Sequence, residues 1–439
     1  MTLKLFRALL TTGVLAAGWT SAAQAQECKP EDKKILTVWD QFEYYGMTAS
    51  GPAVEKIHEA FQKEHPCVVF SRSVFGGGFP IRNAVELALT SGEAPDVFYS
   101  WPSGAGLTTY AKAGYLADLS PYAKKYKWSE RLPDWAIARN TYQGKQYAYP
   151  WEQDLEYVYY NKEAFKELGI DVPKSFDDVL AWCDKASAAG KIAISLGNGD
   201  LWPAVNMWTD VTALLGGRQV GLDLLQDKQD WNSAEPKAAL DAILKMVEHK
   251  CFSPGFNGTS YNDALLQFYS GQATAIWTGT WVIQDVVRNM PEDKLDIFYM
   301  PPFDATHPQA THMSEGSAWY VWSGSKVKDL AAEYVNFMSD PRWLETWIKD
   351  GYTIPIQKKP IDFAQYGISG VISKAFNTGM AMVDRNVDAF HTTAPPRVTF
   401  VMYHDIQGVL SGDTKPEDFL KKLDEQMEVA KQAGEVWAP

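Results

Sequence analysis

The segment YAYPWEQDLEYVYYNKEAFKELG, residues 147–169, decides the fold because a loop, a strand and a helix follow one another in it. From Leu155 to Tyr160 the residues alternate and are rich in aromatic and β-branched types, which is typical of a β-strand. Asn161 is a favourable N-cap for the helix that follows, and Gly169 stands where a helix end needs positive φ. The segment therefore predicts a strand that leads directly into a helix.

An aromatic residue and two acids stand before or at the start of this strand, namely Trp151, Glu152 and Asp154. An unpaired carboxylate is costly to remove from water, so we expect that the segment is not entirely buried. We interpret its first half as a place where side chains reach a cleft. The alternative is a buried strand edge.

Strand-like and helix-like patterns alternate in the first part of the chain. They are, in order, ILTVW (35–39), PAVEKIHEAFQKEH (52–65), CVVFSRSVF (67–75), IRNAVELALTSG (81–92) and DVFYS (96–100). This βαβαβ order predicts a parallel α/β sheet with right-handed crossovers. In such sheets ligands bind at the carboxyl ends of the strands, which here are the loops 40–47, 76–79 and 100–106.

The first 25 residues have the features of a secretory signal peptide. Lys4 and Arg7 precede an apolar run at residues 8–17, and Ala23-Gln24-Ala25 is a small-x-small cleavage site. The apolar run is shorter than the roughly 20 residues that span a bilayer. We expect cleavage after Ala25 and a soluble periplasmic protein.

The remaining 414 residues are acidic and exceed the size of one ordinary core. They carry 39 basic and 54 acidic residues, a net charge of −15. This charge argues against nucleic acid and against an anionic membrane surface as partners. The length suggests two domains.

Four cysteines in an exported chain suggest two disulfides, for which three pairings are possible. Cys28 and Cys67 each precede a strand-like run, and they are close in space if those strands are parallel neighbours. Cys183 would then pair with Cys251. The alternative is four buried thiols. A metal site is not expected, because no C-x-x-C is present and the seven His are scattered.

Short motifs in a shared order extend over nearly the whole mature chain. They include GEAPDVFYSW (92–101), AGYLADLSPY (113–122), GQATAIWTGTW (271–281), EGSAWYVW (315–322) and DPRWLETWIKDGYTIPI (340–356). With these motifs the chain resembles the extracellular solute-binding proteins of carbohydrate ABC transporters, the group that includes maltose-binding protein.

The resemblance implies an α/β fold of the two-lobed periplasmic binding protein type, in which each lobe is a mostly parallel sheet flanked by helices. Lobe one would comprise 26–149 and 316–354, and lobe two 150–315 and 355–439. The lobes would close on a sugar about a hinge of two or three crossings. These crossings are expected near 149–157, 311–319 and 352–357.

A sugar site needs aromatic platforms for C–H faces and polar side chains for hydroxyls. The resemblance points to Trp281 as a platform and to Asp154 as the acid of the first crossing. The predicted ligand contacts are Glu43, Tyr44, Ser100, Trp101, Trp151, Glu152, Asp154, Trp202, Trp281, Gly316, Ser317 and Arg397. Each of them has packing as an alternative, and Arg397 could instead anchor a surface carboxylate. Trp39, Trp182, Trp319 and Trp322 are expected to pack.

The resemblance implies a monomeric periplasmic protein that captures a mono- or oligosaccharide and delivers it to an inner-membrane ABC permease. No cofactor, metal or catalytic residue is expected. One alternative is a secreted glycan hydrolase that uses Glu152 and Asp154. Acids two residues apart on a strand share one face, however, whereas hydrolase acids usually come from different elements. The other alternative is the same fold with a polyol or polyamine as ligand.

Overall fold

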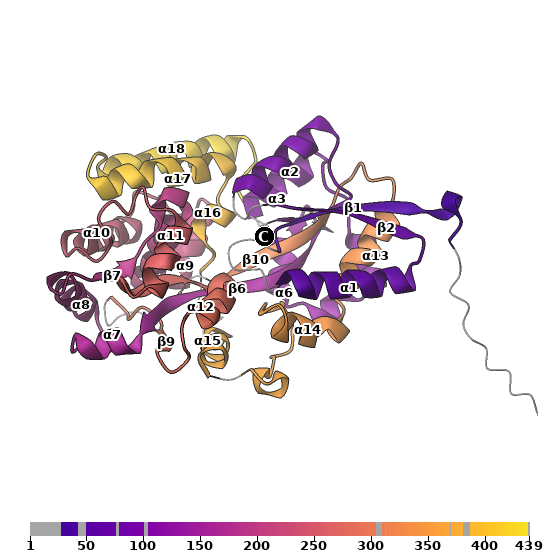
Figure 1. The fold of residues 1–439 in the computed structure, drawn as a ribbon. Coiled ribbons are helices and arrows are strands. Elements are labelled where there is room, and N and C mark those ends of the chain that lie inside the picture. Colours follow the sequence, from indigo (N-terminus) through magenta and orange to yellow (C-terminus); the bar gives the residue numbers. More distant parts are fainter. Residues whose placement is uncertain are drawn as a thin grey trace, which may run out of the picture.

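The structure is a computed structural model that describes residues 28–42, 50–75, 79–100, 104–303, 310–311, 313–368, 370–380 and 387–437. The predicted signal peptide, residues 1–25, lies outside these ranges. Within them, none of the helices combines the length and apolar character that a membrane span requires. The described chain forms two lobes that lie side by side (Figure 1).

One eight-stranded sheet runs through both lobes in the order β2-β1-β3-β10-β6-β8-β7, with β9 paired to β6. Its strands are β1 (Lys34–Asp40), β2 (Val68–Val74), β3 (Val97–Ser100), β6 (Ala148–Asn161), β7 (Ile192–Ser195), β8 (Ala273–Gly279), β9 (Leu295–Phe298) and β10 (Met313–Val321). A small hairpin, β4 (Thr141–Tyr142) and β5 (Lys145–Gln146), stands apart from it. The fold is thus the predicted α/β type.

Helices cover the sheet in both lobes (Figure 1). Those of lobe one are α1 (Ser50–Glu64), α2 (Phe79–Ser91), α3 (Gly104–Lys112), α4 (Ser120–Lys125), α5 (Trp128–Arg131), α6 (Asp134–Arg139), α13 (Lys328–Met338) and α14 (Leu344–Lys349). Those of lobe two are α7 (Lys162–Glu167), α8 (Phe176–Ala188), α9 (Trp202–Leu225), α10 (Ala234–Glu248), α11 (Tyr261–Tyr269), α12 (Ile283–Asn289), α15 (Gly370–Met380), α16 (Phe390–Thr393), α17 (Pro396–Ser411) and α18 (Pro416–Gln432). Short 3-10 helices lie at Pro30–Asp32, Asn198–Asp200, Thr280–Val282, Pro341–Trp343 and Phe363–Tyr366.

The predicted βαβαβ unit is present at the start of lobe one. β1 pairs in parallel with both β2 and β3, and α1 and α2 form the crossovers. α1 buries Val54, Ile57 and Phe61, which follow helical spacing along one face. The carboxyl end of β1 points toward lobe two (Figure 1), and β3, which is parallel to β1, ends on the same side. Ligands bind at this end of the strands in parallel α/β sheets.

The two lobes are joined by long antiparallel strands. β10 pairs with β3 in lobe one and with β6, whose second half pairs with β8 and β9 in lobe two. Residues 352–356 run along the other edge of β6, where Gln153 N donates to Ile354 O at 2.9 Å and Ile356 N to Trp151 O at 2.8 Å. The three segments expected as crossings thus lie side by side. The lobe boundaries themselves stay a prediction.

From the sequence we expected β6 to start later than it does, and its acids to lie closer to solvent than they do. β6 begins at Ala148, so Glu152 lies within the strand, and only Asp154 and Asn161 of its residues are not buried. The segment is therefore not entirely buried, as expected, because Asp154 stays partly exposed, whereas Glu152 is buried. Its carboxyl accepts a hydrogen bond from Tyr99, and burial raises its pKa to about 8. A carboxyl that stays protonated at neutral pH is much less costly to bury than a carboxylate.

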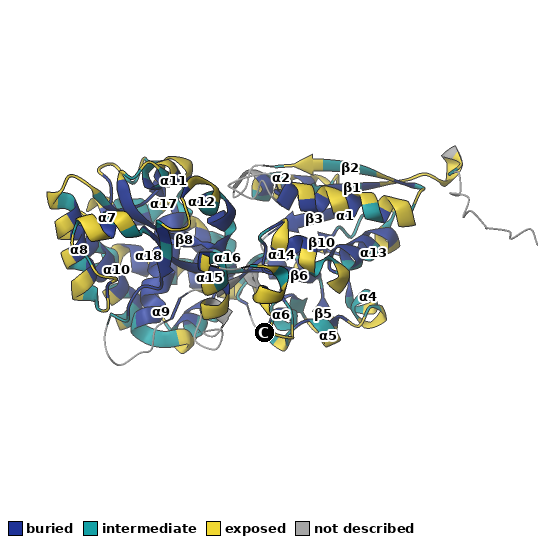
Figure 2. Ribbon diagram, turned by 60° about the horizontal axis from the view of Figure 1, so that its bottom comes forward, coloured by how far each residue is buried: buried dark blue, intermediate teal, exposed yellow. Residues whose placement is uncertain are grey.

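Each lobe has its own apolar core, and buried residues fill the centre of both (Figure 2). Trp319 is fully buried in the core of lobe one, and Trp182 is buried in that of lobe two. Trp39 and Trp322 are partly buried against a smaller cluster of lobe one. All four pack as the sequence analysis expected.

Both predicted disulfides are present, Cys28–Cys67 and Cys183–Cys251. The first ties the segment before β1 to the start of β2, where Lys34 N also donates to Cys67 O at 2.8 Å. The parallel pairing of these strands is what brings the two cysteines together.

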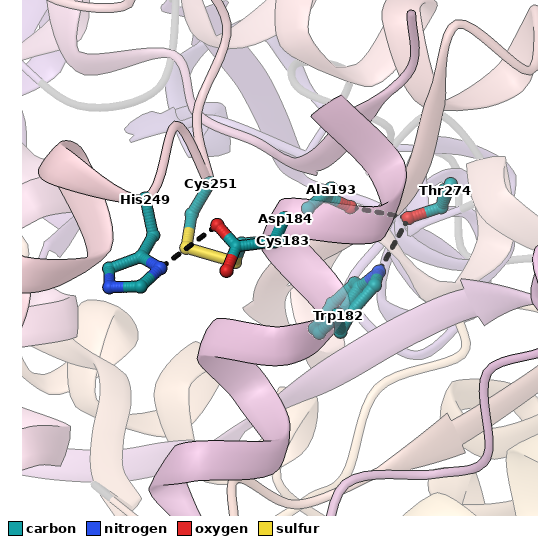
Figure 3. Close-up of a disulfide and its surroundings, with 7 residues drawn as sticks. All are labelled: Trp182, Cys183, Asp184, Ala193, His249, Cys251 and Thr274. Atoms are coloured by element: carbon teal, nitrogen blue, oxygen red, sulfur yellow. Dashed lines mark hydrogen bonds and ion pairs between the residues drawn. A yellow bond between two sulfur atoms is a disulfide. The ribbon is translucent and has the colours of Figure 1, made fainter. Parts of the chain in front are cut away.

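The second disulfide joins α8 to the segment after α10 and lies beside a chain of hydrogen bonds (Figure 3). Trp182 Nε1 donates to Thr274 Oγ1 at 3.1 Å, and that hydroxyl donates to Ala193 O at 2.7 Å. These bonds hold α8 against β7 and β8, so the disulfide closes a region that packing already orders.

Candidate functional site

A pocket that is partly open to solvent lies where β6 passes between the lobes. Its walls come from the start of α1, from β6, from the turn between β8 and α12, and from the crossing after α14. It is lined by Ser50, Glu152, Gln153, Asp154, Thr280, Trp281, Ile283, Gln284, Gly351, Tyr352, Thr353 and Ile354. The pocket thus draws on segments of both lobes and on two of the crossings.

The Trp281 ring is held in one orientation by its neighbours. Its Nε1 donates to the Tyr261 hydroxyl at 2.8 Å, and that hydroxyl lies 2.6 Å from Thr278 Oγ1. Trp202 packs against it in an edge contact, with ring centroids 5.6 Å apart. A Cβ at Gly279 would lie 2.0 Å from the Trp281 ring, so only glycine fits there. The half-buried ring is therefore a rigid apolar surface at the pocket.

Two acids from β6, Glu152 and Asp154, face the same pocket. The pKa of Glu152 is raised to about 8, first by burial and then by the charge of Asp154. Asp154 Oδ1 accepts a hydrogen bond from Thr280 Oγ1 at 3.2 Å. A Cβ at Gly316 would lie 2.4 Å from Asp154 Oδ2 and 2.8 Å from Glu152 Cγ. The glycine on β10 thus provides the space that both carboxyl groups occupy.

Another part of the pocket lining comes from the start of α1 and the crossing after α14. Ser50 Oγ donates to Gly351 O at 3.0 Å, which ties the start of α1 to the crossing after α14. Tyr352 has a positive φ of 50°, an unfavourable conformation for a residue with a side chain. Thr353 is buried beside it. This wall is therefore fixed by hydrogen bonding and by an unusual backbone conformation.

A second group of buried ionisable side chains includes Glu315 on β10, the residue before Gly316. Glu315 is 2% exposed and accepts hydrogen bonds from Asn140 Nδ2 at 2.7 and 2.9 Å. Burial raises its pKa to about 8 in spite of the nearby positive charge of Arg139. Arg139, at the end of α6, forms an ion pair with the buried Asp388 before α16. This pair connects a helix of lobe one to lobe two.

Among the predicted site residues, Glu152, Asp154 and Trp281 line the pocket directly. Gly316 abuts both acids, and Trp202 supports the Trp281 ring. Ser100 and Ser317 are buried on the paired strands β3 and β10. Glu43, Tyr44 and Trp101 lie outside the described residues.

Two predicted contacts have other surroundings in the structure. Trp151 is 2% exposed and packs at 4.6 Å against Trp347 in the core of lobe one, because adjacent residues of a strand point to opposite faces. Arg397 lies in α17, where its Nε donates to Glu435 Oε2 at 2.9 Å. Arg397 thus anchors a carboxylate, which was the alternative to ligand contact.

Sequence reasoning missed nine residues of the pocket lining, namely Ser50, Gln153, Thr280, Ile283, Gln284, Gly351, Tyr352, Thr353 and Ile354. Thr280 and Gln284 have a local signal, since they flank Trp281 in the chain. Tyr352 and Thr353 belong to the motif that predicted the third crossing. Ser50 has no such signal, because only the folded chain brings α1 to the pocket.

A family model and several relatives agree on the family to which this chain is similar. Residues 45–345 match the family model described as bacterial extracellular solute-binding protein. A probable sugar-binding periplasmic protein of Mesorhizobium japonicum is 31% identical over 209 residues, which cover 47% of this chain and 49% of that protein. The multiple sugar-binding protein of Streptococcus mutans is 26% identical over 370 residues, 79% of this chain and 80% of that protein.

The match to the Mesorhizobium protein spans about half of that relative's length. A solved structure from work on xylan utilization by the thermophilic bacterium Caldanaerobius polysaccharolyticus has a TM-score of 0.81 at 22% identity. It covers 90% of this chain and 100% of that one, so the two share their fold.

Proposed function

Because this chain belongs to the bacterial extracellular solute-binding proteins, we propose that it captures a mono- or oligosaccharide in the pocket around Trp281 and delivers it to an ABC importer. The observation that carries the proposal is the convergence of a rigid aromatic ring and two acids in one pocket between the lobes. The names of the relatives in Mesorhizobium and Streptococcus support a sugar as the ligand.

In this proposal the ring and the acids bind different parts of the sugar. The C–H face of a pyranose packs on Trp281, and its hydroxyls donate to Asp154. Burial raises the pKa of Glu152, and in its protonated form this carboxyl can both donate to and accept from a hydroxyl. Because Trp281 is already fixed by Tyr261 and Trp202, little side-chain entropy is lost on binding.

Closure of the lobes is the proposed means of capture and release. Ser50 belongs to lobe one and Trp281 to lobe two, so a ligand between them is enclosed when the lobes approach. Binding would then shift the population toward the closed form. We further propose that the protein acts as a periplasmic monomer after cleavage at Ala25, with an inner-membrane permease as its partner.

We propose no catalytic step for the two acids. Glu152 and Asp154 stand two residues apart on β6, and both approach the pocket from that strand. A glycosidase needs carboxyl groups that flank the scissile bond from two sides. The arrangement therefore favours binding over hydrolysis.

The test is a thermal-shift screen of the protein against mono- and oligosaccharides, followed by calorimetry with each sugar that raises Tm. Trp281→Ala should raise the Kd of that sugar at least about 30-fold, because truncating a central aromatic contact costs about 2 kcal/mol or more. Trp343→Ala is the matched control, since Trp343 is partly buried on lobe one and does not line the pocket. A panel without any stabilising sugar, or an unchanged Kd in Trp281→Ala, would refute the proposal.

A further inference from the structure

The pocket is lined by acidic side chains and, among the described residues, by no basic ones. Glu152 and Asp154 are both acids, and neither Lys nor Arg occurs among the described lining residues. The described lining therefore supplies no fixed positive charge.

Two arginines of lobe one are already paired with acids. Arg72 donates to Asp40 from Nε and Nη2 at 2.7 and 2.8 Å, and from Nη1 to Glu55 at 2.6 Å. Arg139 is paired with Asp388.

We propose that this site selects ligands that are uncharged or carry an amino group, and rejects glycans that carry a carboxylate or a phosphate. That the ligand is a glycan rests on the proposed function. The preference for its charge rests on the residues of the pocket itself. An ammonium group can donate to Asp154, whereas a uronate carboxylate at the same place meets a like charge.

The expected discrimination is large. Two like charges about 5 Å apart at a protein surface repel enough to weaken binding on the order of 100-fold. The mature chain also has a net charge of −15, which adds a longer-range repulsion that salt screens. The discrimination should therefore decrease as ionic strength rises.

The first test needs no identified sugar, because Trp281 reports on the charge of its own pocket. Fluorescence quenching by iodide, caesium and neutral acrylamide is measured for the protein and for Trp281→Phe, and the difference isolates Trp281. The efficiency of each quencher is divided by its efficiency for free N-acetyltryptophanamide. On this scale we expect iodide to quench Trp281 at least threefold less efficiently than caesium does. Equal efficiency at low salt would overturn the inference.

Matched variants separate the local charge from the net charge. Asp154→Asn should bring the iodide and caesium efficiencies together, since it removes an acid from the pocket. Asp171→Asn makes the same change in net charge at an exposed position of lobe two and should leave their ratio unchanged. An equal effect of the two variants would assign the asymmetry to net charge and refute the inference.

The second test uses the sugar that the thermal-shift screen identifies, together with its uronate and its amino derivative. We expect the uronate to bind at least about 30-fold more weakly than the parent, the amino sugar to bind at least as well, and Asp154→Asn to reduce the ratio of uronate to parent Kd. A uronate that binds as tightly as its parent would refute this inference and leave the proposed function intact. A screen without any binding sugar would refute the proposed function, and the quenching result would still decide the charge of the ligand.

Discussion

Glu315→Gln should remove a pH-dependent loss of stability that the native protein carries. Glu315 is buried on β10, and its pKa is raised from 4.5 to about 8. The folded protein thus holds a proton that the unfolded chain has released above pH 4.5. Folding stability therefore decreases as the pH rises from about 4.5 to about 8, and the full penalty remains above pH 8.

The size of the effect follows from this shift. Each pH unit within the window costs about 1.4 kcal/mol per carboxyl, so Glu315 accounts for at most about 4 kcal/mol between pH 5 and pH 8. A glutamine at 315 cannot ionise and keeps an oxygen that accepts from Asn140. The variant should gain stability relative to the native protein as the pH rises, although Glu152 leaves a residual pH dependence in both.

The assay is urea unfolding of both proteins at pH 5 and pH 8, followed by fluorescence, with the difference in unfolding free energy compared between them. Glu59→Gln, at an exposed position of α1, is the matched control and should follow the native protein. If native protein and Glu315→Gln lose the same free energy between pH 5 and pH 8, the reasoning is wrong.

Three further predictions concern the pocket, the disulfide and the contact between lobes. Gly316→Ala places a methyl group 2.4 Å from Asp154 Oδ2, so sugar affinity in calorimetry should decrease at least about tenfold; unchanged affinity would contradict the spacing argument. Replacing Cys183 and Cys251 by Ala opens a loop with a sequence separation of 68 and should cost up to about 4 kcal/mol in urea unfolding, whereas an unchanged midpoint would show that packing alone orders the loop. Asp388→Asn leaves the Arg139 guanidinium buried without its counter-charge, so the free energy of unfolding should fall by about 3–5 kcal/mol. A decrease below about 1 kcal/mol would show that the ion pair is solvated.

Features that depend on neighbouring residues in the chain were predictable from the sequence. Asn161 caps α7 by accepting from Glu163 N at 2.9 Å, and Ser175 caps α8 by accepting from Asp178 N at 3.2 Å. The alternation of strands and helices in lobe one and the pairing of all four cysteines follow from similarly short patterns and from parallel strand order.

Features that depend on distant partners were not predictable. The partner that lets Glu152 be buried is Tyr99, 53 residues away, and no local pattern indicates that contact. Ser50 reaches the pocket through Gly351, 301 residues away. The contact of Trp151 was not predictable either. Its aromatic ring suits a sugar platform, but the alternation of side chains along β6 directs it toward Trp347.

The continuous strand β6 has a consequence for anyone who converts this protein into a sugar sensor. Its residue Tyr149 belongs to the core of lobe one and Val158 to that of lobe two, so a single strand completes both hydrophobic interiors. A fluorescent module inserted between these residues would deprive both interiors of a strand, although this is the point where the lobes meet. Insertion sites should instead be sought in exposed turns such as residues 412–413, which lie between α17 and α18.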